Sequence, residues 1–196
     1  MICHNGEINT LEGNVNAMKT REGSFYSEDF PVPLQHLYPV VEPDGSDSMA
    51  LDNVMQFLVH TSGRSVPHTM LMLVPQAWQH VTDMDEKWRA FYAWHAHIME
   101  PWDGPALLCF SDGRYLGSLL DRNGLRPARY AVTRDGHVVF GSETGILPDV
   151  IRPENTVVKG RLKPGKMFLI DFEQKRIISD REIKVKCYFQ REKRIL

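Results

Sequence analysis

Several features that define specialised protein classes are missing from this 196-residue sequence. No apolar stretch approaches the roughly 18 residues of a membrane span, and the N-terminus lacks the basic and then apolar pattern of a secretory signal. Neither charge dominates, since 23 Lys and Arg residues accompany 25 Asp and Glu residues. We therefore expect no membrane and no nucleic acid partner, and a location in the cytoplasm or in an organelle matrix or stroma.

Cysteine is also scarce. The three residues Cys3, Cys109 and Cys187 are far apart and form no Cys-x-x-Cys pair. This spacing predicts reduced thiols and excludes an encoded disulfide framework, zinc site or iron–sulfur site. Glycine patterns for dinucleotide or triphosphate binding are absent as well, so no cofactor is expected in this segment.

The histidines show no spacing typical of metal ligands. His95 and His97 are two residues apart and would point about 200° away from each other on a helix, so they cannot chelate one ion as an i, i+4 pair would. His60, His68 and His80 share no spacing either. No metal site is predicted.

The first half of the sequence is predicted to be mainly helical. Apolar residues recur at helical intervals in three segments, and a proline-rich stretch over residues 24–46 is expected to be a loop. The predicted helices cover residues 9–22 and 85–99, with a short one over 69–73. A further helix contains residues 51–59, opens at the candidate caps Ser46, Asp47 and Ser48 and ends near Gly63. The aromatic residues of this half, Trp88, Phe91, Tyr92 and Trp102, are interpreted as core residues.

After Pro101 the pattern changes to the period of two that is typical of strands. Asp112-Gly113 and Asp135-Gly136 separate alternating apolar runs, which is a strong hairpin signal. The predicted strands cover residues 106–110, 115–120, 129–133, 137–141, 166–172 and 176–178. An α+β fold with antiparallel sheets packed against helices is therefore expected. Residues 186–196 are predicted to be a charged tail outside the core, leading toward a further domain.

Asn5 and Gly6 carry the first chemical signal. A carboxamide N–H and an unobstructed backbone N–H can together stabilise one developing oxyanion. The alternative is a type I′ turn, which Asn-Gly also favours. The sequence continues into a helical pattern rather than a second strand, and this favours the oxyanion interpretation.

Five segments together resemble the glutamine amidotransferase domain of the glutamate synthase large chain, with Met99–Ala106 the most specific of them. The resemblance covers residues 1 to about 184. Its segments are His4–Asn14, Ser46–Asn53, Gly63–His68, Met99–Ala106 and Leu120–Tyr130.

The resemblance implies an N-terminal-nucleophile hydrolase, a sandwich of two antiparallel sheets between helical layers, incomplete here at its N-terminus. It implies hydrolysis of L-glutamine to glutamate, with the ammonia passed to 2-oxoglutarate by the rest of the glutamate synthase chain, where FMN and an iron–sulfur cluster are bound. Asn5 and Gly6 would form the oxyanion hole, and Asp47 would bind the α-ammonium group of glutamine. The alternative for Asp47 is the N-cap of the helix that follows.

The nucleophile implied by the resemblance is a cysteine upstream of this segment. Cys3 is interpreted as a small buried residue instead, since removal of Met1 would expose Ile2. Met1 is expected to be an internal methionine or the start of a fragment, and the isolated chain is expected to be inactive. Residues 1–185 would be the C-terminal portion of the domain.

Other interpretations remain open. Arg122, Arg126 and Arg129 could pin a loop around the site, although a scaffold role in a turn is favoured. The chain could also be a non-catalytic glutamine-binding or structural module. A third alternative is the corresponding domain of another class II enzyme, such as amidophosphoribosyltransferase or asparagine synthetase.

Overall fold

A computed structural model describes residues 1–28 and 30–189. Its helices are α1 (Leu11–Glu22), α2 (Asp47–Ser62), α3 (Val66–Leu73), α4 (Glu86–Ile98) and α5 (Asp180–Phe189), with a 3-10 turn over Leu34–Leu37. Its strands are β1 (Ile2–Gly6), β2 (Ala106–Ser111), β3 (Tyr115–Leu120), β4 (Arg129–Thr133), β5 (Val138–Gly141), β6 (Thr156–Arg161), β7 (Met167–Asp171) and β8 (Arg176–Ile178).

The strands form two antiparallel sheets. The larger has the order β1-β2-β3-β7-β8, and the smaller has the order β5-β4-β6. Within residues 1–28 and 30–189, strand β1 lies at an edge and pairs with β2 alone, from Ile2 opposite Phe110 to Gly6 opposite Ala106. Cys3 of this edge strand is exposed, so its interpretation as a small buried residue is wrong. The α+β class with antiparallel sheets is confirmed.

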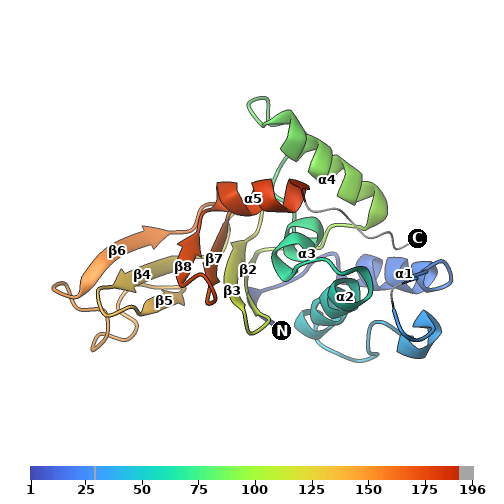
Figure 1. The fold of residues 1–196 in the computed structure, drawn as a ribbon, viewed down its shortest axis with the longest axis horizontal. Coiled ribbons are helices and arrows are strands. Elements are labelled where there is room, and N and C mark those ends of the chain that lie inside the picture. Colours follow the sequence, from blue (N-terminus) through green and yellow to red (C-terminus); the bar gives the residue numbers. More distant parts are fainter. Residues whose placement is uncertain (29, 190–196) are drawn as a thin grey trace.

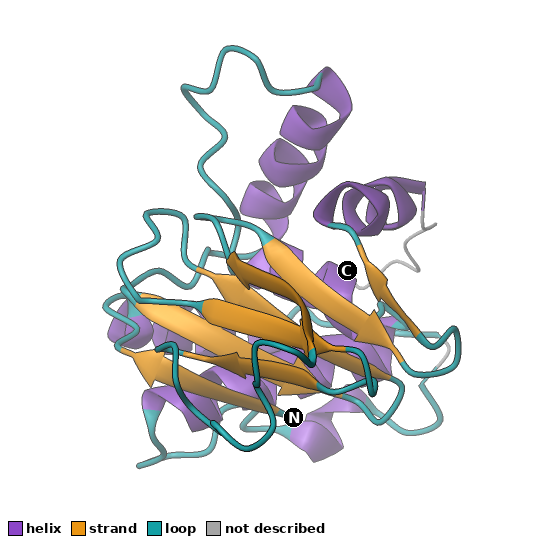
Figure 2. Ribbon diagram, turned by 90° about the vertical axis from the view of Figure 1, so that its left-hand side faces the viewer, coloured by secondary structure: helices purple, strands orange, loops and turns teal. Residues whose placement is uncertain are grey.

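The layers follow from the alternation of side chains along the strands. Leu108 and Phe110 of β2 join the core beneath the helices, whereas Leu107 packs with Leu120 and Phe168 in a second core between the sheets. Figure 1 shows this order, with the smaller sheet at the left, the larger sheet in the middle and helices α1–α3 at the right. Figure 2 shows the same helices behind the strands. Among the described residues no helix covers the outer face of the smaller sheet.

Helix α2 has clear boundaries. The side chain of Ser46 accepts a hydrogen bond from the backbone N–H of Met49 at 3.2 Å, and Gly63 ends the helix with a φ of 66°. Ser46 is therefore the N-cap and Asp47 is the first helical residue, so the capping interpretation of Asp47 is wrong. Leu51, with an exposed fraction of 0%, lies on the face that α2 buries.

Three elements differ from the sequence-based expectations. Strand β1 contains Asn5-Gly6, strand β6 lies where the sequence predicts no strand, and helix α5 extends over residues expected to form a tail. Cys187 in α5 is buried in the main core, because it follows the buried Ile183 by four residues and shares its face of the helix. Residues 190–196 lie outside the described part of the chain.

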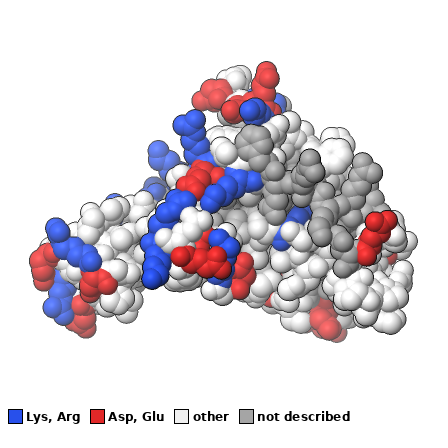
Figure 3. Space-filling model, viewed as in Figure 1, with Lys and Arg blue, Asp and Glu red and all other residues white. Residues whose placement is uncertain are grey.

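Charges of both signs alternate on the surface. On the face shown in Figure 3, Lys and Arg lie beside Asp and Glu around α5 and β8, in agreement with ion pairs of Arg176 and Lys186 with Glu182 and of Lys166 with Asp180. Of the helices in residues 1–28 and 30–189, none combines the length and apolar character needed to cross a bilayer.

Candidate functional site

The backbone of Gly6 lies at an edge of the larger sheet, beyond which the described part of the chain supplies no further strand. The backbone N–H of Glu7 donates to the carbonyl oxygen of Pro105 at 3.2 Å. Alternate residues of an antiparallel strand bond to the same neighbour, so the N–H of Gly6 points away from β2. Gly6 has a φ of 142°, and a Cβ there would lie 1.8 Å from the oxygen of Pro105. Only glycine fits this close approach.

Asn5 lies on the face of β1 that is directed toward the smaller sheet. Its register partner Leu107 packs between the sheets, and its Nδ2 atom donates to Oγ of Ser142 at 3.2 Å. A carboxamide nitrogen carries two hydrogens, so one stays available for a ligand. Asn5-Gly6 is part of a strand, and the type I′ turn interpretation is wrong.

Asp47 is held by backbone groups from the segment after β1 and from its own helix. Its Oδ2 accepts from the N–H of Ile8 at 3.1 Å, and its Oδ1 accepts from the N–H of Ser48 at 2.7 Å. The positive end of the α2 dipole also favours a carboxylate at this position. The side chain keeps 18% exposure, so a fixed negative charge faces solvent close to the end of β1.

His4 connects the two parts of this site and was not singled out from the sequence. Its side chain points to the helix side of β1 and is 4% exposed. Nδ1 lies 2.5 Å from Oγ of Ser48, and Nε2 lies 3.3 Å from Oδ2 of Asp47. No sequence signal identifies this contact, because it depends on where α2 packs against β1.

The segment 99–106 braces the residues that follow β1. The carbonyl oxygen of Asp103 accepts from the N–H of Asn9 at 2.8 Å, and its N–H donates to Oγ1 of Thr10 at 3.0 Å. Trp102 is buried and its N–H donates to the carbonyl oxygen of Leu73 at 2.7 Å. Residues 99–106, the most specific motif of the sequence, therefore fix the position of the segment that follows Asn5 and Gly6.

Two of the three candidate arginines contact the segment 99–106. Arg122 forms an ion pair with Asp103, and Nε of Arg126 donates to the carbonyl oxygen of Pro105 at 3.3 Å. Arg129 lies elsewhere, on the outer face of the smaller sheet. The structure thus brings Arg122 and Arg126 together as supports of the site and leaves Arg129 apart.

The histidines of α3 and α4 do not gather around an ion site. Nε2 of His68 lies 3.1 Å from Nε2 of the buried His95, whereas Nδ1 of His97 lies 2.6 Å from the carbonyl oxygen of Ala93. Across residues 1–28 and 30–189, no group of three or more His, Cys, Asp or Glu side chains is placed to hold a metal.

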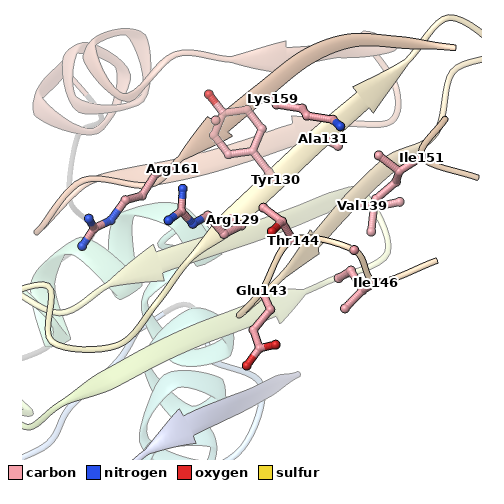
Figure 4. Close-up of a pocket in the computed structure, with 12 residues that line it drawn as sticks. Arg129, Tyr130, Ala131, Val139, Glu143, Thr144, Ile146, Ile151, Lys159 and Arg161 are labelled. Carbon is pink, nitrogen blue, oxygen red and sulfur yellow. The ribbon is translucent and has the colours of Figure 1, made fainter. Parts of the chain in front are cut away.

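A cavity of about 200 Å³ lies apart from these residues. Figure 4 shows Arg129, Lys159 and Arg161 on the outer face of the smaller sheet, with Ile146 from the loop after β5 closing one side. None of Asn5, Gly6 and Asp47 lines it. The loop that lines it follows β5 and begins at Ser142, the partner of Asn5.

The chain is similar to one described protein family and to several known enzymes. Residues 1–194 match the family model described as class-II glutamine amidotransferases. The chain is 51% identical to the glutamate synthase (NADPH) large chain of Bacillus subtilis (strain 168), over 93% of this chain and 12% of that protein. It is 49% identical to the glutamate synthase (NADH) of Saccharomyces cerevisiae, over 93% of this chain and 8% of that protein.

The chain is 42% identical to the chloroplastic ferredoxin-dependent glutamate synthase of Oryza sativa subsp. japonica, over 94% of this chain and 11% of that protein. Among solved structures, glutamine phosphoribosylpyrophosphate amidotransferase from B. subtilis superposes with a TM-score of 0.47 at 18% identity, over 91% of this chain and 28% of that one. The chain thus spans about a tenth of the length of the glutamate synthases. Since the family model covers residues 1–194, the chain belongs to the class-II glutamine amidotransferases.

Proposed function

We propose that this chain is the glutamine-hydrolysing portion of a glutamate synthase. It would release ammonia from L-glutamine for the reductive amination of 2-oxoglutarate by the rest of that enzyme. The observation that carries the proposal is the placement of two neutral donors, Asn5 Nδ2 and Gly6 N–H, on a free strand edge beside the fixed carboxylate of Asp47. Similarity to three glutamate synthases of different electron-donor types supports the choice of holoenzyme.

The proposed chemistry assigns a separate task to each residue. The carboxylate of Asp47 accepts a charge-assisted hydrogen bond from the α-ammonium group of glutamine. When a nucleophile attacks the side-chain amide, negative charge develops on the carbonyl oxygen, and the N–H groups of Asn5 and Gly6 stabilise it. Loss of ammonia and hydrolysis of the acyl intermediate then give glutamate.

Cys3 is not assigned as the nucleophile. It lies opposite Cys109 on the neighbouring strand and two residues from Asn5 on the same face of β1, where it cannot also face the donors across a substrate. The cysteine implied by family resemblance is a separate residue, whose own α-amino group would act as base.

The iron–sulfur cluster implied for the holoenzyme does not fit this segment. Such clusters are typically held by four cysteine thiolates, and the sequence has three cysteines. Cys187 is buried in the helix-side core, whereas Cys3 and Cys109 share the opposite face of the larger sheet. We assign the cluster to another part of the holoenzyme.

The test uses the full-length gene product that carries this sequence. Asn5→Ala removes one oxyanion donor and is expected to lower glutamine-dependent kcat by about 10²- to 10³-fold, with little change in KM. Ammonia-dependent glutamate synthesis bypasses the site and should stay unchanged. Asn16→Ala, the same chemical change on the exposed surface of α1, is the matched control.

The outcome separates the alternatives. Glutamine-dependent kcat within about threefold of wild type would assign Asn5 a purely structural role. Parallel loss of both activities would mean that Asn5 supports the fold or a domain interface. Glutamine binding without any glutamine-dependent activity in the unmodified protein would favour a non-catalytic binding module.

A further inference from the structure

We infer that His4 is a positioning residue for glutamine binding, acting through Asp47. The inference rests on the proposed function, because it takes Asp47 as the partner of the substrate ammonium. It concerns a residue on the opposite face of β1 from Asn5, so His4 does not approach the reacting amide.

Because His4 is buried, the polar atoms of its ring depend on contacts within the protein. Its side chain is 4% exposed, and a buried polar atom without a partner is costly. Nδ1 lies 2.5 Å from Oγ of Ser48. Nε2 has no well-aligned hydrogen-bond partner among the described residues, and the carboxylate oxygen of Asp47 at 3.3 Å is its compensating contact.

This arrangement fixes where the hydrogens lie. A nitrogen lone pair directed at a carboxylate oxygen would be repulsive, so we assign a hydrogen to Nε2 in either charge state of the ring. In the neutral ring Nδ1 is then an acceptor, and the hydroxyl of Ser48 donates to it. The imidazole therefore presents its N–H edge to Asp47 and its other edge to the next residue of α2.

The contacts of Asp47 show what His4 controls. Two carboxylate oxygens offer about four acceptor positions. The N–H groups of Ile8 and Ser48 occupy two of them, and acceptor capacity remains for an incoming ammonium group. Nε2 of His4 lies 3.3 Å from Oδ2, so the imidazole limits how far this side of the carboxylate can turn. His4 thereby restricts the orientation of Asp47 and ties it to the strand that carries Asn5.

A purely structural histidine would behave differently. A residue that only fills space between β1 and α2 would affect stability, kcat and KM together when replaced. A positioning residue for Asp47 affects KM for glutamine, leaves the chemical step nearly intact, and loses its effect once the charge of Asp47 is removed.

Two substitutions of His4 distinguish the role of Nδ1, which faces Ser48, from the role of Nε2, which faces Asp47. A glutamine amide nitrogen lies at the same bond distance from Cα as Nε2, so His4→Gln can still donate to Asp47. An asparagine amide corresponds to Nδ1, so His4→Asn can contact Ser48 but not Asp47. In the full-length gene product, His4→Asn should raise KM for glutamine about 5- to 20-fold with kcat within about threefold, and His4→Gln should stay within about threefold of wild type for both.

A double-mutant cycle completes the test. If His4 acts through Asp47, His4→Asn combined with Asp47→Asn should be no worse than Asp47→Asn alone. Additive effects, or equal effects of His4→Asn and His4→Gln, would overturn the inference. If His4→Asn does not fold, Ser48→Ala removes the anchor of the ring instead, and an unchanged KM for glutamine in that variant would also overturn it.

The same measurements keep the two proposals apart. If Asp47→Asn and Asn5→Ala alter glutamine kinetics while His4→Asn does not, only the role of His4 is withdrawn. If neither Asp47→Asn nor Asn5→Ala alters them, the proposed function itself fails.

Discussion

The carbonyl oxygen of Pro105 lies 1.8 Å from the position that a Cβ on Gly6 would occupy. The two residues belong to neighbouring segments that are about a hundred positions apart in the sequence. Their contact sets the distance between the β1 backbone and the brace formed by residues 99–106. It therefore also sets where the N–H of Gly6 is presented.

Gly6→Ala should disrupt this contact. Because the conflict is with a backbone atom, β1 must shift, which we expect to destabilise the fold by about 1–3 kcal/mol or more and to lower glutamine-dependent kcat by at least about 100-fold. Thermal denaturation and steady-state kinetics measure both effects. Gly13→Ala is the control, since a Cβ at Gly13 meets nothing within 4 Å and should be neutral or slightly stabilising.

Asp47→Asn should weaken glutamine binding without unfolding the protein. The substitution removes the negative charge and one of the two oxygens that accept from Ile8 and Ser48, while the cap on Ser46 is untouched. We expect kcat/KM for glutamine to fall by about 10- to 150-fold, with ammonia-dependent activity nearly unchanged and the Tm lowered by only a few degrees, the effect of one lost hydrogen bond. Asp44→Asn, on an exposed residue nearby, serves as control. Equal loss of both activities would contradict the substrate-binding role.

Ser142→Ala should loosen the carboxamide of Asn5. One neutral hydrogen bond contributes about 0.5–1.5 kcal/mol, so glutamine-dependent kcat should fall by about 2- to 10-fold while KM changes little. Thr144→Ala, on an exposed residue of the same loop, should have no effect. A kcat equal to wild type in Ser142→Ala would mean that Asn5 is oriented by the strand alone.

The cysteines should differ sharply in reactivity. Cys3 is exposed, whereas burial raises the pKa of Cys187 to about 12 and also raises the pKa of Cys109. Because the thiolate is the reactive form, iodoacetamide at pH 8 should label Cys3 in the native chain and leave Cys187 unmodified. Mass spectrometry after denaturation should find all three labelled. Early native labelling of Cys187 would show that α5 opens readily.

Local sequence signals predicted the helices and hairpins well where one pattern dominated. Helix α2 combines apolar spacing, a polar start and a terminal glycine, and all three signals agree. The choice among Ser46, Asp47 and Ser48 as its N-cap could not be made from the sequence, because each has a suitable side chain. The structure selects Ser46, whose oxygen reaches Met49.

Elements that depend on distant contacts were missed. Strand β1 forms because residues 105–110 pair with it, and this pairing overrides the turn preference of Asn5-Gly6. Strand β6 is largely exposed, so it carries little of the alternation that a half-buried strand shows. Helix α5 has many charged residues, and within residues 180–188 it buries Ile183, Lys184 and Cys187, so its apolar pattern is weak.

The candidate site shows the same division. Asn5, Gly6 and Asp47 could be named from motifs, whereas the contact of His4 with Asp47 depends on how α2 packs against β1. No local pattern encodes the distance between residues that are 43 positions apart.

The brace has a consequence for changes in chain length. The backbone of Trp102 is hydrogen-bonded to Leu73, and the carbonyl group of Pro105 packs against Gly6. The number of residues from Trp102 to Pro105 therefore helps to determine the register of β1. A slip of one residue would move Asn5 to the helix side and His4 to the opposite side. An insertion or deletion within residues 103–105 would thus exchange the two side chains without altering either of them.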